Sequence, residues 1–267
     1  LHVRSRRQRQ MCIRDRDIGI SEQFKGRYDG YMLLKFTSCQ EFQQDFLDGK
    51  LFFNTADFFA QCDNLGRGDE NEGNTFLIEH NNPDFMSANL ESVDGKMMIV
   101  VRDYTNNPEN YKPGTIENFS RGENRCRKII SLYTAYVNVS KEIISPFPAK
   151  MGEEFGEYGV LVLDRKKFFE RVCNALRQHS EISKAQLGFV DYMKSEDVHG
   201  FIEWNPFLKM PQYEYQNEFR ISFINDTQKP LKLDLGVSLR DIAFPIKASD
   251  LGEIFFKDNL LYYPLYK

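Results

Sequence analysis

Polar and apolar residues alternate along the segment Tyr213–Ile224, YEYQNEFRISFI, as they do in a strand with one buried face. On such a strand Gln216 and Glu218 share the polar face with Arg220 and Ser222. One interpretation is that Gln216 and Glu218 form a Gln-x-Glu pair lining a cleft, where a carboxylate and an amide can act on a substrate. The other is a half-exposed strand whose Glu–Arg face is solvated.

Oxygen-bearing side chains gather in the Gly-rich loop Asp63–Gly73, DNLGRGDENEG. Asp69, Asn71 and Glu72 are of the types that bind calcium, but an EF-hand loop needs glycine at its sixth position and glutamate at its twelfth. Counting from Asp69, the chain has neither residue there. A surface turn stabilised by Asp and Asn side chains is the favoured interpretation. Arg67, Asp69 and Glu72 remain candidate cleft residues.

Basic residues concentrate in Ser120–Lys128, SRGENRCRK, within an otherwise acidic chain. Such a cluster could hold the phosphates of a dinucleotide or of RNA. A solvated helix start accounts for it equally well. Because no aromatic residues are interleaved, RNA is the less favoured ligand.

The first residues, 1–16, contain six Arg and one acidic residue and resemble translated sequencing-adapter read-through. We therefore expect residues 1–20 to be a non-native or disordered arm. The alternative is a basic arm that binds nucleic acid or directs targeting. Without residues 1–16, Lys and Arg fall from 35 to 29, Asp and Glu fall from 39 to 38, and the net charge moves from −4 to −9. An acidic domain argues against a broad surface for duplex nucleic acid.

Thiol side chains are scattered along the chain. Cys39, Cys62, Cys126 and Cys173 are separated by 23, 64 and 47 residues, and no two cysteines form a Cys-x-x-Cys pair. This pattern predicts neither a zinc site nor disulfides and is typical of a reducing compartment, so we expect a cytoplasmic protein that binds no metal. No apolar run reaches the roughly 18 residues of a membrane helix, which predicts no membrane association.

The elements that would position the polar residues begin with a strand–helix–strand unit over residues 31–54. The short apolar run Tyr31–Phe36 (YMLLKF) predicts the first strand. Apolar residues at helical spacing in Cys39–Asp48 predict the helix. The second apolar run, Leu51–Asn54 (LFFN), predicts the second strand. Gly49 ends the helix where a positive φ is needed.

Further strands are predicted at 97–102, 158–163, 187–193, 218–224, 231–235 and 260–263. Asp164 should cap a helix whose apolar stripe contains Phe168, Phe169, Val172 and Leu176. The run 126–139 is ambiguous between helix and strand. Because helices and strands mix without regular alternation, we predict a single α+β domain over residues 21–267, with a mixed or antiparallel sheet and flanking helices.

Several short motifs occur in an order that resembles a widespread bacterial and phage family of unknown function, met among defence-associated genes. They are Lys-Phe-x-Ser near the start, Leu-Phe-Phe-Asn, Asp-x-x-Glu (Asp69 and Glu72), Val-x-Tyr (Val190 to Tyr192), Phe-Leu-Lys (Phe207 to Lys209) and Tyr-Glu-Tyr-Gln-Asn-Glu-Phe-Arg. The resemblance covers roughly residues 30–225.

The closing Glu-x-Glu-x-Arg of that family, here Gln216 to Arg220, is similar to the Glu-x-Glu or Gln-x-Glu strand of mono-ADP-ribosyltransferases. The opening strand–helix–strand also resembles the start of that fold. The resemblance implies that Glu218 hydrogen-bonds the nicotinamide ribose and stabilises positive charge as the glycosidic bond of NAD breaks, while Gln216 orients the acceptor. The residues that it implies at the cofactor are Lys35, Asn54, Thr55, Arg67 and Arg220. The first strand has no evident His or Arg, and a clear Ser-Thr-Ser is absent, which departs from the usual pattern.

The sequence is therefore consistent with three functions. The resemblance implies an ADP-ribosyltransferase-like enzyme that uses NAD and modifies a protein or nucleic-acid acceptor, as a toxin or defence effector that an antitoxin could restrain. The rival is a non-catalytic interaction protein of phage or bacterial origin. A metal-dependent nuclease is weaker because no compact Asp/Glu/His constellation with a lysine is visible. On a strand face, Glu218→Gln should barely change stability.

Overall fold

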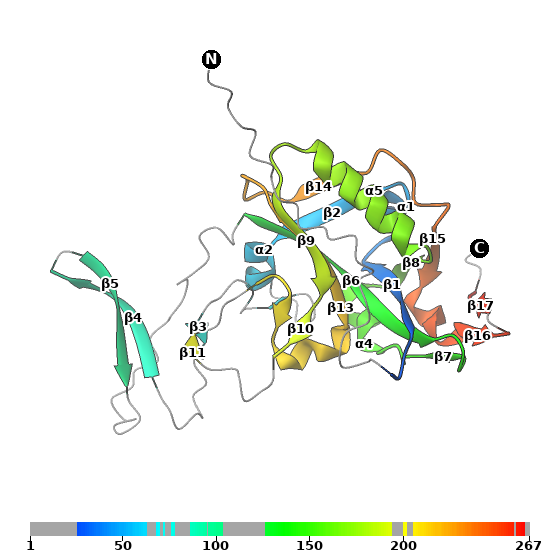
Figure 1. Ribbon diagram of the computed structural model, residues 1–267, viewed down its shortest axis with the longest axis horizontal. Helices are drawn as coiled ribbons and strands as arrows, with labels where there is room; N and C mark the ends of the chain where they lie inside the picture. The colour runs from blue at the N-terminus through cyan, green and yellow to red at the C-terminus, as the bar shows by residue number, and fades with distance from the viewer. Residues whose placement is uncertain are drawn as a thin grey trace, which may run out of the picture.

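The computed structural model describes residues 26–62, 68–69, 72, 76–77, 86–94, 96–103, 126–193, 200–201, 205–258 and 260–264. Their centre is a large antiparallel sheet with helices on both faces (Figure 1). The helices are α1 (Gln40–Leu47), α2 (Ala56–Gln61), α4 (Lys150–Phe155) and α5 (Arg165–Gln178), with the 3₁₀ helices η4 (Pro211–Gln216) and η5 (Ala248–Glu253).

The strands of the large sheet are β1 (Gly30–Thr37), β2 (Lys50–Thr55), β6 (Arg127–Asn138), β7 (Ile143–Ile144), β8 (Tyr158–Val162), β9 (Ser183–Phe189), β13 (Glu218–Ile224), β14 (Leu231–Asp234) and β15 (Ala243–Lys247). Smaller two-stranded pairs are formed by β3 (Phe76–Leu77) with β11 (Gly200–Phe201), β4 (Met86–Val93) with β5 (Lys96–Asp103), β10 (Asp191–Tyr192) with β12 (Leu208–Lys209), and β16 (Phe255–Lys257) with β17 (Leu260–Tyr262).

Strand β6 is the central strand of the large sheet. On one edge it pairs with β1 and then with β2, and on the other edge it pairs with β13, which in turn pairs with β9. The strand order is β14-β2-β6-β1-β8-β15, and each pairing within this sheet is antiparallel. The predicted α+β class and antiparallel sheet are confirmed for the described residues.

The ambiguous run 126–139 is strand β6. All residues of β6 except Ser131 are buried. Because both faces of the strand are covered, apolar residues occupy both faces and the alternation that marks a half-buried strand is lost. Periodicity could therefore not distinguish this strand from a buried helix.

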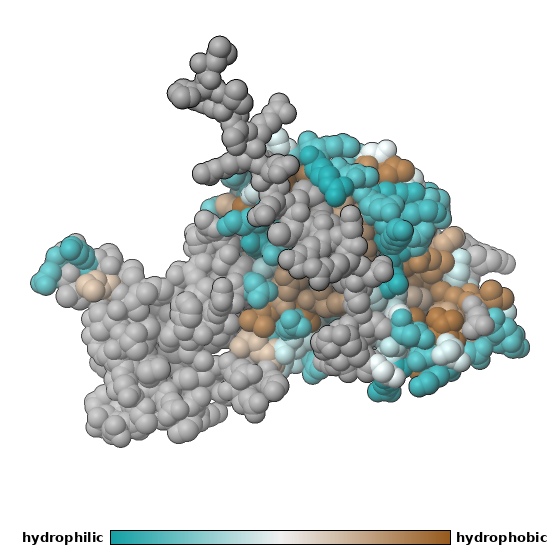
Figure 2. All heavy atoms as spheres, in the orientation of Figure 1, coloured by the Kyte–Doolittle hydropathy of each residue, from teal (hydrophilic) through white to brown (hydrophobic). Residues whose placement is uncertain are grey.

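Helices α1 and α5 cover one face of the sheet, where Leu33 of β1 and Phe219 of β13 are fully buried. The predicted stripe of α5 packs into this core through Phe168, Val172 and Leu176, with Phe169 partly buried against it. Hydrophilic side chains lie over α5 on the outside (Figure 2). The helix is thus amphipathic, as its sequence predicts.

Helix α4 and the 3₁₀ helix η5 cover the opposite face. Met151 of α4 and Leu251 of η5 pack against Leu34 of β1 and Tyr133 of β6 in a second apolar cluster. Strands β1 and β6 therefore contribute side chains to a core on each side. Among the described residues, no helix is long and apolar enough to cross a membrane.

Two local predictions about helix ends are confirmed. Gly49 follows α1 with φ of 82°, and a Cβ at this position would lie 2.2 Å from the carbonyl oxygen of Val237. Asp164 caps α5, because its Oδ1 accepts a hydrogen bond from the Lys167 N–H at 3.0 Å. The strand predicted at 187–193 is divided: β9 begins earlier, at Ser183, and β10 is separate.

We expect Phe219→Ala to cost about 3–5 kcal/mol of unfolding free energy. The ring of Phe219 is fully buried and lies 5.1 Å from the ring of Phe169 and 5.3 Å from that of Phe189, so truncation leaves a cavity. Phe42→Ala is the control, because Phe42 of α1 is 55% exposed and should change stability by no more than about 0.5 kcal/mol. Urea unfolding measures both, and equal losses would contradict this packing.

Candidate functional site

The polar side chains of β13 are buried, and so is Gln216 just before the strand. Glu218, Arg220 and Ser222 lie on the face of β13 opposite to Phe219. The interpretation as a solvated face of a half-exposed strand is therefore wrong. Strand β13 is covered on both sides, one apolar and one polar.

Asn217 breaks the simple alternation between Gln216 and Glu218. Its φ of 40° and ψ of 53° are left-handed, so Gln216 belongs to η4 and not to the strand. Lys209 nevertheless joins the two side chains, because its Nζ donates to Gln216 Oε1 and to Glu218 Oε1, each at 2.6 Å. The Gln-x-Glu pair is thus held by a shared ammonium group and not by the pleat of a strand.

Both carboxylate oxygens of Glu218 are bound. Oε1 accepts from Lys209, and Oε2 accepts from Arg220 Nε at 2.7 Å and from Ser131 Oγ at 2.6 Å. The backbone N–H of Glu218 donates to the Tyr192 hydroxyl at 2.9 Å. The partners of the carboxylate come from β12, β13 and β6, and β10 binds the backbone of the same residue.

Arg220 is shared between Glu218 and a second carboxylate, Glu72. Nη1 and Nη2 of Arg220 donate to Oε1 and Oε2 of Glu72, each at 3.0 Å, and Nη1 also donates to the Pro206 carbonyl at 2.8 Å. Asp69 is buried too, and its carbonyl accepts the Glu72 N–H at 2.8 Å. The prediction of a surface turn is wrong for Asp69 and Glu72, which lie inside the molecule and complete the site.

Charge pairing decides the protonation of this cluster. Burial alone would raise the pKa of Glu218, but Arg220 and Lys209 outweigh burial and hold the pKa of Glu218 well below its usual range. For Glu72, burial prevails over Arg220 and raises the pKa, with the charge of Asp69 acting in the same direction. Glu218 is therefore a buried anion that stays ionised at neutral pH, a group suited to stabilising positive charge.

Tyr215 connects this cluster to helix α4. Its hydroxyl donates to Glu154 and accepts from Gln216 Nε2 at 3.1 Å. Burial, and then the bond to Glu154, raise the pKa of Tyr215 to about 12. The side chain is therefore a neutral link between Glu154 and Gln216 at neutral pH.

Lys35 lies on β1 where this strand separates from β6. The pairing of β1 with β6 ends at Leu34, and Lys35 Nζ donates to the Ser131 carbonyl at 3.0 Å. Because the hydroxyl of Ser131 binds Glu218, Lys35 and Glu218 contact the same residue. By strand alternation, however, Lys35 shares the face of β1 that carries Leu33, whereas Glu218 faces away from Phe219, so the two side chains extend from opposite faces of the sheet.

The other residues predicted at the cofactor lie apart from the Glu218 carboxylate or outside the described residues. Asn54 and Thr55 end β2 and pair with the start of β6. The Thr55 hydroxyl accepts the Phe58 N–H at 3.0 Å and caps α2. Arg67 lies outside the described residues.

The basic cluster 120–128 is described only from Cys126 onward. Arg127 and Lys128 open β6 and are buried, so a solvated helix start is wrong for them. Arg127 Nη1 donates to Ser222 Oγ at 3.3 Å, and Lys128 Nζ donates to the carbonyls of Cys126 and Thr227. These two side chains therefore bind groups of the protein itself.

Sequence reasoning gave no role to Lys209, Tyr192 or Ser131. Lys209 and Tyr192 end the Phe-Leu-Lys and Val-x-Tyr motifs, so the motifs themselves carried a signal. Ser131 is the least buried residue of β6, but a serine in an ambiguous apolar run gives no such signal. Within the described residues, no group of three or more His, Cys, Asp and Glu side chains could hold a metal ion.

Glu218→Gln is expected to cost about 3–5 kcal/mol of unfolding free energy at neutral pH, because it leaves Lys209 and Arg220 buried with one anion fewer. This revises the expectation of an almost unchanged stability. Glu72→Gln should cost clearly less, since burial already disfavours the charge of Glu72. Glu170→Gln, on the exposed side of α5, is the control and should be neutral. Urea unfolding tests the order, and a larger cost for Glu72→Gln would refute it.

Acid should weaken the fold through Glu218. Because the folded-state pKa of Glu218 is depressed, its ion pairs stabilise the fold above the unfolded pKa of about 4.3 and are lost as the pH falls through the folded value. Unfolding free energies measured from about pH 5 downward should therefore fall less steeply in Glu218→Gln than in the wild type. The raised pKa of Glu72 acts with opposite sign, so Glu72→Gln should keep the steep loss. Identical slopes in all three proteins would contradict this assignment.

Comparisons of the chain with protein-family models, with curated proteins and with solved structures found no match. No relative therefore supplies a function or a set of functional residues. The buried cluster around Glu218 is the feature from which a function can be argued.

Proposed function

We propose that the protein is an ADP-ribosyltransferase-like enzyme that cleaves NAD and transfers ADP-ribose to a protein or nucleic-acid acceptor. The observation that carries the proposal is the buried carboxylate of Glu218, which is bound by Lys209 and Arg220 and joined to Gln216 through Lys209. The order β1–α1–β2 at the start and β13 near the end supports the related proposal of an ADP-ribosyltransferase-like fold. As a toxin or defence effector, such an enzyme would be restrained by an antitoxin.

In the proposed reaction, the bond between ribose C1′ and the nicotinamide nitrogen breaks, and nicotinamide leaves with the bonding electron pair. Positive charge develops on the ribose, and Glu218 would stabilise it. A nucleophilic atom of the acceptor then bonds to C1′ and gives up its proton. A fixed carboxylate in a buried setting is effective here because little solvent screens its charge.

The other residues of the cluster have separate roles in this proposal. Arg220 would position Glu218 and keep it ionised, since its guanidinium already binds Glu218, Glu72 and the Pro206 carbonyl. Gln216 would orient the acceptor. Lys35, with Asn54, Thr55 and Arg67, keeps the role of contacting NAD that the resemblance implies.

One observation favours a second candidate, a non-catalytic interaction protein. The side chain of Glu218 is only 7% exposed, and Lys209, Arg220 and Ser131 already bind its oxygens. For catalysis, the ribose would have to replace one of these partners. If none is replaced, the cluster is a polar core that holds β13 and its covering segments together.

NAD should raise the melting temperature of the wild type, and the protein should release nicotinamide from NAD. Glu218→Gln should lower the rate about 10²-fold or more, because the stabilising charge is lost. The rates must be compared at a temperature where circular dichroism shows both proteins folded. Glu218→Asp, which retains the charge, should keep more activity than Glu218→Gln, and Glu170→Gln should match the wild type.

Two outcomes would count against this assignment. Robust wild-type turnover that is unchanged in Glu218→Gln would remove Glu218 from the reaction. A wild-type protein that neither binds NAD nor releases nicotinamide, with protein and nucleic-acid acceptors present, would favour the interaction protein.

A further inference from the structure

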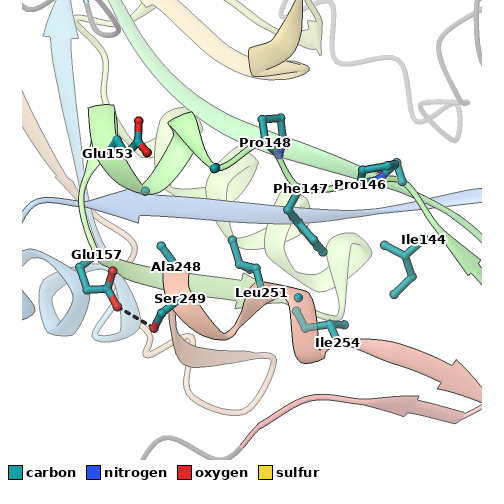
Figure 3. A pocket seen from close by; sticks show the side chains of 14 residues that line it. Ile144, Pro146, Phe147, Pro148, Glu153, Glu157, Ala248, Ser249, Leu251 and Ile254 are labelled. Carbon is teal, nitrogen blue, oxygen red and sulfur yellow. Dashed lines mark hydrogen bonds between the residues drawn. The ribbon is translucent and has the colours of Figure 1, made fainter.

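A groove opens on the side of the sheet that carries α4, away from the α1 and α5 face (Figure 3). It lies between the segment after β7, helix α4 and the 3₁₀ helix η5, and its volume is about 630 Å³. The apolar side chains of Ile144, Phe147, Leu251 and Ile254 line it. A groove of this size and lining can accept side chains of a ligand.

Close approach of α4 and η5 shapes one wall of the groove. A Cβ on Gly152 would lie 2.9 Å from the Cβ of Ala248, so the two helices nearly touch there. Gly252 differs, because a Cβ built on it meets no atom of the described residues within 4 Å. A larger side chain at Gly252 would therefore enter open space at the groove without displacing its walls.

The charged residues that line the groove are acidic. Glu153 and Glu157 are both exposed, and the described residues that line the groove include no Lys or Arg. Figure 3 shows Glu157 accepting a hydrogen bond from Ser249, at 2.8 Å, which fixes this carboxylate on the rim. Asp250 and Glu253 of η5 add carboxylates beside the groove, and the neighbouring Lys150 and Lys247 are not among its lining residues. A ligand with positive charge is therefore favoured.

An exposed apolar surface lies on the β16–β17 hairpin, which follows the groove residue Ile254 in the chain. Phe255 follows Ile254 directly and is 50% exposed, and Leu260 on β17 is 60% exposed. The rings of Phe255 and Tyr262 are stacked with centroids 4.9 Å apart, and β16 packs beside β7. Figure 2 shows hydrophobic side chains gathered at this end of the molecule. Exposed apolar surface of this kind marks interaction sites.

We propose that the groove and the β16–β17 hairpin bind a peptide segment of a partner protein in which apolar side chains are interleaved with Lys or Arg. The apolar residues would enter the groove and cover Phe255, and the basic residues would meet Glu153 and Glu157. A second copy of this acidic chain fits less well, because like charges would approach the rim. This site is separate from Glu218, so it goes beyond the proposed function and does not rest on it.

The probe is a short fluorescent peptide in which leucine alternates with lysine. The control peptide has the same sequence with glutamate in place of lysine. Fluorescence anisotropy with the full chain should show binding of the leucine–lysine peptide only, and added salt should weaken it. Gly252→Leu, which adds a large side chain at the groove, and Glu153→Lys, which reverses the charge at one position of its rim, should each weaken binding about tenfold or more. Glu170→Lys is the matched control on α5 and should bind as the wild type does.

Several results would overturn the proposal. One is the absence of binding, and another is equal binding of both peptides. A third is binding that Gly252→Leu and Glu153→Lys leave unchanged while both variants stay folded by circular dichroism. If the wild type is dimeric in solution and Gly252→Leu makes it monomeric, the occupant is a second copy and not a basic peptide.

Discussion

Two cationic side chains, Lys209 and Arg220, lie in the interior with 4% and 3% of their surface exposed. Removing a charge from water costs several kcal/mol unless an opposite charge and hydrogen bonds replace the solvent. Glu218 and Glu72 provide that compensation, and the Pro206 carbonyl completes the shell of Arg220. This requirement constrains where η4, β12 and residue 72 lie. They must bring Gln216, Lys209 and Glu72, respectively, to the buried cluster around Glu218 and Arg220.

The same requirement suits a functional role of the cluster as well as a structural one. A buried ion-pair network rarely gives more stability than apolar packing of similar volume, so its presence is weak evidence for stability alone. It does fix an ionised carboxylate at one position, with Gln216 oriented beside it through Lys209. Such preorganisation is what catalysis of a charge-separating reaction needs.

Local patterns predicted the elements whose stabilisation is local. The unit 31–54 and helix α5 follow from helical spacing, from Gly49 and from the Asp164 cap, since these signals act within a few residues. The pairing of Gln216 with Glu218 was predicted for the wrong reason, because Asn217 interrupts the strand and Lys209 restores the contact. Contacts between segments far apart in the chain leave no pattern among neighbouring residues, so they could not be predicted in this way.

The contact of Glu72 with Arg220 is the clearest case, since these residues are 148 positions apart. An Asp-x-x-Glu loop is consistent with a solvated turn until a guanidinium from another strand is placed against it. Burial of the polar face of β13 likewise depends on which segments cover it, and sequence alternation describes the strand alone. The sequence thus identified several residues of the buried cluster, such as Glu218 and Arg220, but it did not identify the residues that they contact.

The central position of β6 has a consequence for how the chain folds. Apart from β7, its pairing strands come from distant parts of the sequence, with β1 and β2 well before it and β13 well after it. Formation of the sheet must therefore wait for long loops to close, which slows folding. During that time the apolar run of β6 is exposed to other chains and prone to aggregation. Arg127 and Lys128 at its start place two charges next to this run. Charges that flank an apolar strand oppose aggregation until the neighbouring strands have paired with it.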